Sequence, residues 1–150
     1  MQATARGPYL VEQPIHKAMN AMRSMSRPDG FASVNYRLSA PDYWRFLGMT
    51  GEQYTKQLRS RASAYALFVM AKGGSGDLAR LRWYRDVQFN EEQSPLARAQ
   101  IAAGLAIMGD RARARLAFRQ AIEKIGYYDP NDWYQSPLRD LAGVIALAYE

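Results

Sequence analysis

The stretch "EQSPLARAQIAAGLAIMGD" (Glu92–Asp110) decides the fold, because a helix start, an apolar helix and a helix stop follow one another within it. Its opening phrase Gln-Ser-Pro-Leu returns in "YQSPLRDLAGVIALAYE" (Tyr134–Glu150), where the serine stands 42 residues further along the chain. A serine oxygen accepts hydrogen bonds from the free amides of a first helical turn, and proline fits the first helical position. The phrase therefore predicts two helices, capped by Ser94 and Ser136. An interval of this length favours stacked helix pairs, although two unrelated helices with similar starts remain an alternative.

Four more segments place apolar residues at helical spacing. They are Pro14–Met25, Thr50–Lys72, Asp77–Val87 and Arg111–Ile125. Thr50 and Gln53 stand at the spacing of a capping box, and Gly73 with Gly74 is expected to end that helix in the left-handed region. The last helix is apolar all round, which predicts burial on several sides. One of its sides carries Leu138, Leu141, Ala142, Ile145 and Tyr149, and another carries Val144, Leu147 and Ala148.

No segment alternates apolar and polar residues as a half-buried strand does, and residues 32–44 allow at most a short strand or an extended link. We therefore predict an all-α fold of antiparallel helical hairpins. Residues 1–13 are expected to be a lead-in segment, and residues 14–150 one helical fragment.

Composition narrows the class of protein. A chain of 150 residues with 48% hydrophobic residues can form one domain with its own core. Cysteine is absent, which removes thiol catalysis, disulfides and thiolate metal sites from this chain. No apolar run is long enough to cross a bilayer, and the first residues lack the apolar centre of a signal peptide.

Residues able to carry chemistry are few. His16 is the single histidine, so a histidine-pair metal site is excluded, and we interpret His16 as a structural or surface side chain. The "GGSG" run at Gly73–Gly76 lacks the lysine and the preceding strand of a phosphate loop. Glu91 and Glu92 are adjacent and should point apart. We therefore predict no catalytic residue, no metal site and no cofactor, and a protein that is not an enzyme.

Two surfaces are candidates for contact with other molecules. The net charge is +6, and "RARAR" (Arg111–Arg115) concentrates arginine, but two-residue spacing spreads the charges of Arg111, Arg113 and Arg115 around a helix. Alanines between them do not favour stacking on bases, so a solvated face is the preferred interpretation. Aromatic residues gather in the loop before Ser136, where we predict packing over helix ends or a protein-contact surface. These residues are Tyr127, Tyr128, Trp133 and Tyr134.

The wording of three successive stretches resembles one known family. The stretches are "ASAYALFVMAKGGSGDLARLRWYRD" (Ala62–Asp86), "SPLARAQIAAGLAIMGDRARARLAFRQAI" (Ser94–Ile122) and "DWYQSPLRDLAGVIALAYE" (Asp132–Glu150). In this order they are similar to the C-terminal half of the thioester (complement-like) domain of bacterial alpha-2-macroglobulins. The match runs from about residue 61 to residue 150.

The resemblance implies an α/α toroid whose helix pairs alternate between an inner and an outer ring. It implies a periplasmic location, with lipid anchoring of the parent protein in the cell envelope left open. Proteins of this family trap attacking proteases, and a Cys-Leu-Glu-Gln thioester bonds to the protease after cleavage of a bait region. That motif lies in the other half of the toroid, so no thioester residue is expected here. The implied partners are neighbouring domains of the parent protein and the trapped proteases, without nucleic acid or direct membrane contact by this part.

Half of a toroid would leave apolar flanks exposed, so we expect the isolated piece to be marginally stable or to self-associate. The alternative is a tetratricopeptide-like helical-repeat module for protein binding, because Ala114, Phe118 and Ala121 have the spacing of its second helix. An arginine-rich nucleic-acid module ranks third, and an enzyme ranks last.

Overall fold

The computed structural model describes residues 17, 18, 20, 50–127 and 136–149. Within these ranges every regular element is a helix, so the predicted all-α class is confirmed for the described part of the chain. Lys17, Ala18 and Asn20 are helical and lie within the predicted helix Pro14–Met25. The other predictions for residues 1–49, including His16, lie outside the described residues.

Six helical elements follow one another in the well-described part. They are α3 (Gly51–Lys72), α4 (Leu78–Trp83), the π-helical η2 (Tyr84–Gln88), α5 (Pro95–Ile107), α6 (Arg111–Ile122) and α7 (Pro137–Ala148). The predicted helices over these ranges are present, with α5 one residue and α6 three residues shorter at the C-terminal end than expected. None of the described helices is both long and apolar enough to cross a membrane.

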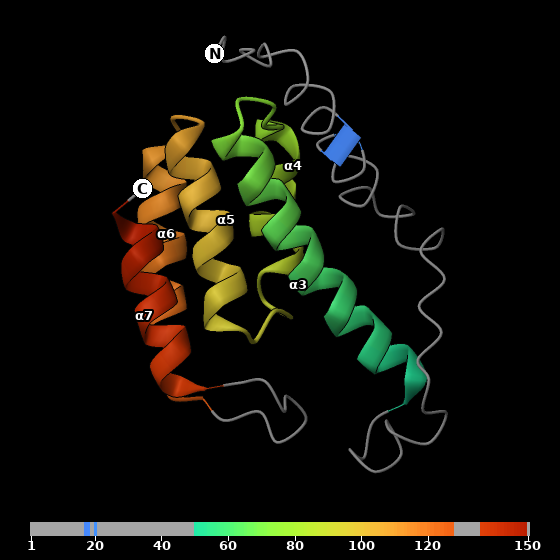
Figure 1. The fold of residues 1–150 in the computed structure, drawn as a ribbon. Coiled ribbons are helices and arrows are strands. Elements are labelled where there is room, and N and C mark those ends of the chain that lie inside the picture. Colours follow the sequence, from blue (N-terminus) through green and yellow to red (C-terminus); the bar gives the residue numbers. More distant parts are fainter. Residues whose placement is uncertain (1–16, 19, 21–49, 128–135, 150) are drawn as a thin grey trace, which may run out of the picture.

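The helices form two layers with α5 at the centre (Figure 1). α3, α5 and α7 lie side by side in one layer, and α4 and α6 lie behind them. α5 contacts each of α3, α4, α6 and α7, and its most extensive packing is with α6. α3, α4, α6 and α7 are therefore all held against α5.

Helix starts follow the predicted caps. Ser94 Oγ accepts a hydrogen bond from the Ala97 amide at 3.3 Å, and Ser136 Oγ accepts one from the Arg139 amide at 3.4 Å. At the start of α3 the predicted capping box is also confirmed. Its two bonds are Gln53 N to Thr50 Oγ1 at 3.2 Å and Thr50 N to Gln53 Oε1 at 3.0 Å. These caps satisfy amides that a helix leaves without an internal partner.

The stop of α3 differs from expectation at one glycine. Gly73 has a φ of −82°, whereas Gly74 has a φ of +73°. Of these two glycines, only Gly74 therefore takes the left-handed backbone conformation, which residues with a Cβ rarely adopt. The prediction was correct for Gly74 and wrong for Gly73, because one left-handed residue is enough to turn the chain out of a helix.

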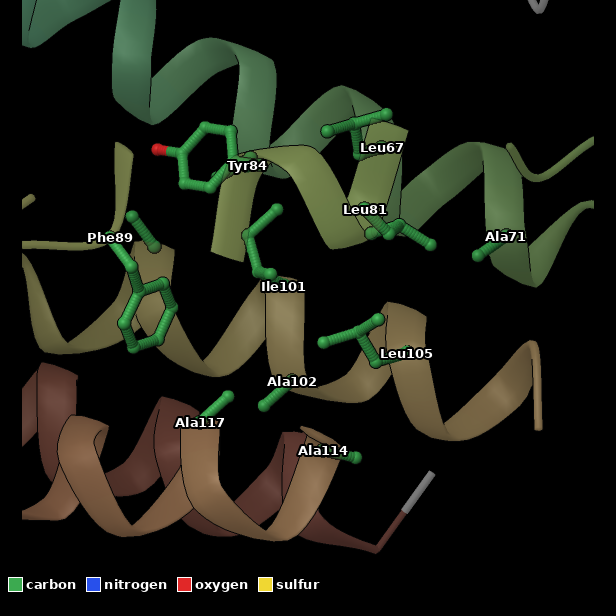
Figure 2. Packing of buried hydrophobic residues seen from close by; sticks show 12 residues of the cluster. Leu67, Ala71, Leu81, Tyr84, Phe89, Ile101, Ala102, Leu105, Ala114 and Ala117 are labelled. Carbon is green, nitrogen blue, oxygen red and sulfur yellow. The ribbon is translucent and has the colours of Figure 1, made fainter. Parts of the chain in front are cut away.

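The main core fills the space between the two layers (Figure 2). Ile101 and Leu105 of α5 point toward Leu81 and Tyr84, while Ala102 of α5 points toward Ala117 of α6 (Figure 2). Small residues between α5 and α6 allow the two backbones to approach closely, which increases dispersion contacts. Gly104 serves the same purpose, because a Cβ there would lie 2.8 Å from a methyl carbon of Leu81.

Candidate functional site

α7 has apolar residues on two opposite sides, and only one side is packed. Asp140 and Val144 are buried, and Gly143 lies so close to Leu96 of α5 that an added Cβ would be 2.6 Å from its Cδ1. Val144 also packs with Ala99 of α5 and Ala121 of α6, in a second apolar cluster. This packed side attaches α7 to the rest of the bundle.

The opposite side of α7 faces solvent. We call it the outer α7 stripe and define it by four large apolar side chains with their exposed fractions: Leu138 76%, Leu141 42%, Ile145 51% and Tyr149 89%. Steps of three, four and four residues between them keep all four on one side of the helix. The prediction that α7 is buried on several sides is therefore wrong for the described structure. Its physical reason is that the two helices in contact with α7 meet it on the same side, where Val144 packs against both α5 and α6.

Monomeric proteins seldom expose contiguous apolar patches larger than about 300–600 Å², and larger patches mark contact surfaces. The outer α7 stripe gathers four large, exposed apolar side chains on one side of a single helix and its C-cap. Its members cannot fold back on the core, because the helix backbone holds them on the far side from Val144. The outer α7 stripe is the best candidate for a protein-contact surface in the described residues.

Of the predicted aromatic surface, the structure describes one residue. Tyr127 is exposed, and the Lys124 ammonium lies 5.2 Å from the centroid of its ring, which is within range of a cation–π interaction. Lys124 Nζ also donates to Gln93 Oε1 at 2.8 Å, which ties the end of α6 to the loop before α5. The other three residues, Tyr128, Trp133 and Tyr134, lie outside the described residues, so their contact role stays a prediction.

A buried polar cluster joins α3, η2 and the start of α5. Ser60 Oγ donates to Glu92 Oε2 at 2.5 Å, and the Tyr84 hydroxyl lies 2.6 Å from Ser60 Oγ and 3.2 Å from the same Glu92 oxygen. The other carboxylate oxygen, Oε1, accepts from the Ser94 amide at 2.8 Å. Burial raises the pKa of the Tyr84 phenol, and the neighbouring Glu92 charge raises it further. Tyr84 is therefore a neutral donor in this cluster.

Arg98 extends the cluster into the centre of the bundle. Its guanidinium donates to three backbone carbonyl oxygens, those of Glu92 at 2.7 Å, Phe89 at 2.9 Å and Gln120 at 3.2 Å. The side chain also lies over the Phe89 ring, with 4.8 Å between the guanidinium carbon and the centroid. Burial lowers the pKa of Arg98, and the nearby Glu92 carboxylate opposes that change. Arg98 satisfies carbonyls that would otherwise be buried without donors.

The arrangement of these groups indicates a structural role. Each oxygen of the Glu92 carboxylate already accepts a hydrogen bond from the protein, so the bonds join the helices that supply the donors. In the part of the chain that the structure describes, no three metal-binding side chains come together. Sequence reasoning missed this cluster. Its one local signal is that Glu92 stands two residues before the cap Ser94, from which a carboxylate can reach the cap amide.

Glu91 and Glu92 point apart, as predicted for adjacent residues. Glu91 is exposed and pairs with Lys56 at 2.5 Å, whereas Glu92 is 4% exposed.

The arginines near α6 differ in whether they form ion pairs. Arg113 pairs with Asp110 at 3.2 Å and with Asp86 at 3.5 Å. The other two arginines of "RARAR", Arg111 and Arg115, are exposed on α6.

The Asp110 carboxylate caps the start of α6 and connects it to α4. It accepts from the Arg113 amide at 3.3 Å and from Arg82 Nε at 2.7 Å. The hydrogen bond from Arg82 holds the pKa of Asp110 below its usual value. The sequence analysis did not name Asp110 as a cap, although aspartate directly before the first residue of a helix is a preferred N-cap.

No protein-family model, no curated protein and no solved structure matches the chain.

Proposed function

We propose that this chain is a non-catalytic helical part of a bacterial alpha-2-macroglobulin-like protein, which traps proteases at the cell envelope. In this proposal its helices are antiparallel hairpins that form half of an α/α toroid. Two kinds of support exist for it. The first is the wording of the three stretches between Ala62 and Glu150, and the second is the outer α7 stripe.

The outer α7 stripe is the observation that carries the proposal. α3, α5 and α7 are successive members of one layer, and the middle member, α5, is covered on both sides by the other two (Figure 1). α7 is the last described member, and its uncovered side carries large apolar residues instead of charges. Covering such a surface with a further helix would stabilise both partners by roughly 25 cal/mol per Å² of buried apolar area. An apolar side of this kind suits a helix that has another neighbour in a larger array.

A scaffold role also agrees with the buried polar cluster. Arg98 donates to backbone carbonyls of several segments and Glu92 accepts from the Ser60 hydroxyl of α3, which fixes the relative positions of α3, α5 and α6. A trapping protein needs such a rigid frame, because the reactive bond must be held apart from water until the bait region is cut. In this proposal the covalent step belongs to a thioester outside the chain, and the residues described here hold the frame.

The test uses the protein encoded by the complete reading frame that contains this chain. It is mixed with an endopeptidase, and the remaining activity is measured on a large protein substrate and on a small peptide substrate. We expect the protein substrate to be protected and the peptide substrate to be cut normally, because a trapped protease keeps a working active site. Equal inhibition on both substrates, or inhibition on neither, would contradict trapping.

Variants connect that result to the outer α7 stripe. The double variant Leu138→Glu with Ile145→Glu should lower trapping, since charges would oppose burial against a neighbouring helix. A matched control is Leu116→Glu, which changes an exposed apolar residue of α6. We expect this control to trap proteases as the unaltered protein does.

A tetratricopeptide-like module for protein binding is the second candidate. The observation that favours it is the close α5–α6 pair, in which Ala114, Ala117 and Ala121 are all buried. The two candidates differ in the complete reading frame. A Cys-Leu-Glu-Gln motif upstream with β-rich domains around it supports the macroglobulin, and a short frame of helical repeats supports the module.

A further inference from the structure

The described arginines divide into paired and unpaired groups. Among residues 50–127 and 136–149, ion pairs hold the arginines of α4 and η2, and Arg113 of α6 belongs with them. Arg111, Arg115 and Arg119 are different, because they are exposed and no carboxylate of the described residues pairs with them. We call these three residues the α6 arginine row.

The row runs along one side of α6. Its members are four residues apart, and residues at that spacing lie one above the other on a helix, about 6 Å apart along its axis. The buried side of α6, formed by Ala114, Ala117 and Ala121, is a different one. The row therefore does not face the core between α5 and α6. Two exposed apolar residues flank it, Leu116 at 46% and Ile122 at 59% exposure.

This placement disfavours the helix by itself. Like charges four residues apart repel each other, and positive charges close to a helix N-terminus oppose the helix dipole. The first turn of α6 holds no acidic residue, and the Asp110 carboxylate at its N-cap is already bound by Arg82 and Arg113. A surface selected only for solubility and stability would alternate the signs of its charges. A row that lowers helix stability is therefore evidence for a binding role.

We propose that the α6 arginine row binds an acidic amphipathic helix of a partner protein. Such a helix can present carboxylates at the same four-residue spacing, so that each can meet one guanidinium with paired hydrogen bonds. Apolar side chains beside those carboxylates would cover Leu116 and Ile122. A nucleic acid fits less well, because the row contains no aromatic side chain for stacking and phosphates give nothing apolar to these two residues. The inference does not rest on the proposed function, since the row lies on α6 and the outer stripe on α7.

The probe is a synthetic helical peptide with glutamate at every fourth position and leucines on the adjoining ridge. Its binding to the chain is followed by fluorescence anisotropy at low and at high salt. We expect binding that weakens with salt, because exposed ion pairs are screened. Replacing all three members of the row, with Arg111→Gln, Arg115→Gln and Arg119→Gln, should weaken binding about tenfold at low salt.

The matched control removes the same amount of charge from exposed positions of α3, with Lys56→Gln, Arg59→Gln and Lys72→Gln. We expect this control to bind the peptide within about twofold of the unaltered chain. The melting temperature of the row variant should equal or exceed that of the unaltered chain, because repulsion along α6 is relieved. If the triple variant does not fold, the single variant Arg115→Gln takes its place.

Three results would overturn the proposal. The first is a peptide that does not bind the unaltered chain, and the second is equal weakening by the row variant and the α3 control. The third is stronger binding of the row to a DNA duplex or to phosphatidylserine vesicles, which would assign it to a nucleic acid or a membrane. None of these results would bear on trapping by the complete protein.

Discussion

α5 and α7 share the start phrase Gln-Ser-Pro-Leu, have nearly the same length and are both rich in apolar residues, yet they are buried to very different extents. α5 has nine buried residues of thirteen, whereas α7 has two of twelve. Equivalent positions show the contrast directly. Leu96, two residues after the first cap, packs against Gly143, whereas Leu138, two residues after the second cap, is 76% exposed.

The difference shows that apolar character decides which residues of a helix can be buried. The number of helices packed against that helix decides which of them are in fact buried. α5 has a helix on every side, while α7 is packed by α5 and α6 on one side only. An apolar helix with one free side is stable as long as its packed side holds it. The free side then adds little to folding and is available for association.

The largest expected effect comes from the charged residue inside α5. Replacing Arg98 with methionine keeps much of the volume but leaves the carbonyl oxygens of Phe89, Glu92 and Gln120 without a donor. We expect the free energy of unfolding to fall by about 4 kcal/mol, because each unsatisfied buried group costs about 1–3 kcal/mol. Urea unfolding measures the loss, and Arg115→Met on the exposed side of α6 is the control. A loss below about 1 kcal/mol would show that water satisfies those carbonyls.

The next effect compares apolar residues of the two helices. Leu105→Ala in α5 should lower the free energy of unfolding by about 3 kcal/mol, since it opens a cavity in the core. Ile145→Ala in the outer α7 stripe should change it by less than about 0.5 kcal/mol, as exposed substitutions do. Thermal and urea unfolding of the isolated chain measure both. If the two losses were equal, the outer stripe would be covered, and the contrast between the helices would fail.

The smallest effect concerns Gly104 and Gly143, the two glycines against which a leucine of a neighbouring helix packs closely. Gly104→Ala places a methyl group 2.8 Å from Leu81, which has no exposed surface and cannot move aside. We expect a net loss of about 1 kcal/mol, because the clash outweighs the gain in helix propensity. Gly143→Ala meets only the end of the partly exposed Leu96 side chain, so a gain of about 0.5 kcal/mol is expected. A shared sign for the two changes in unfolding free energy would contradict this distinction.

The fold class, the helix starts at Thr50, Ser94 and Ser136, and most helix ends were predictable. The candidate sites were less so. Sequence reasoning listed all four stripe residues on one side of α7 but predicted burial on several sides of that helix, because the number of its neighbours is not a local property. It predicted that Glu91 and Glu92 point apart, but not that one forms a surface ion pair and the other is a buried acceptor.

Local chemistry alone settled where helices begin and which residues share a side. These properties depend on groups within about four residues of each other, where the geometry of a helix is already known. Only the tertiary structure decided which arginines are paired, which glutamate is buried and which side of α7 remains open. Those outcomes depend on contacts between segments far apart in the chain, such as Arg98 with Gln120 and Ser60 with Glu92, which no local pattern specifies.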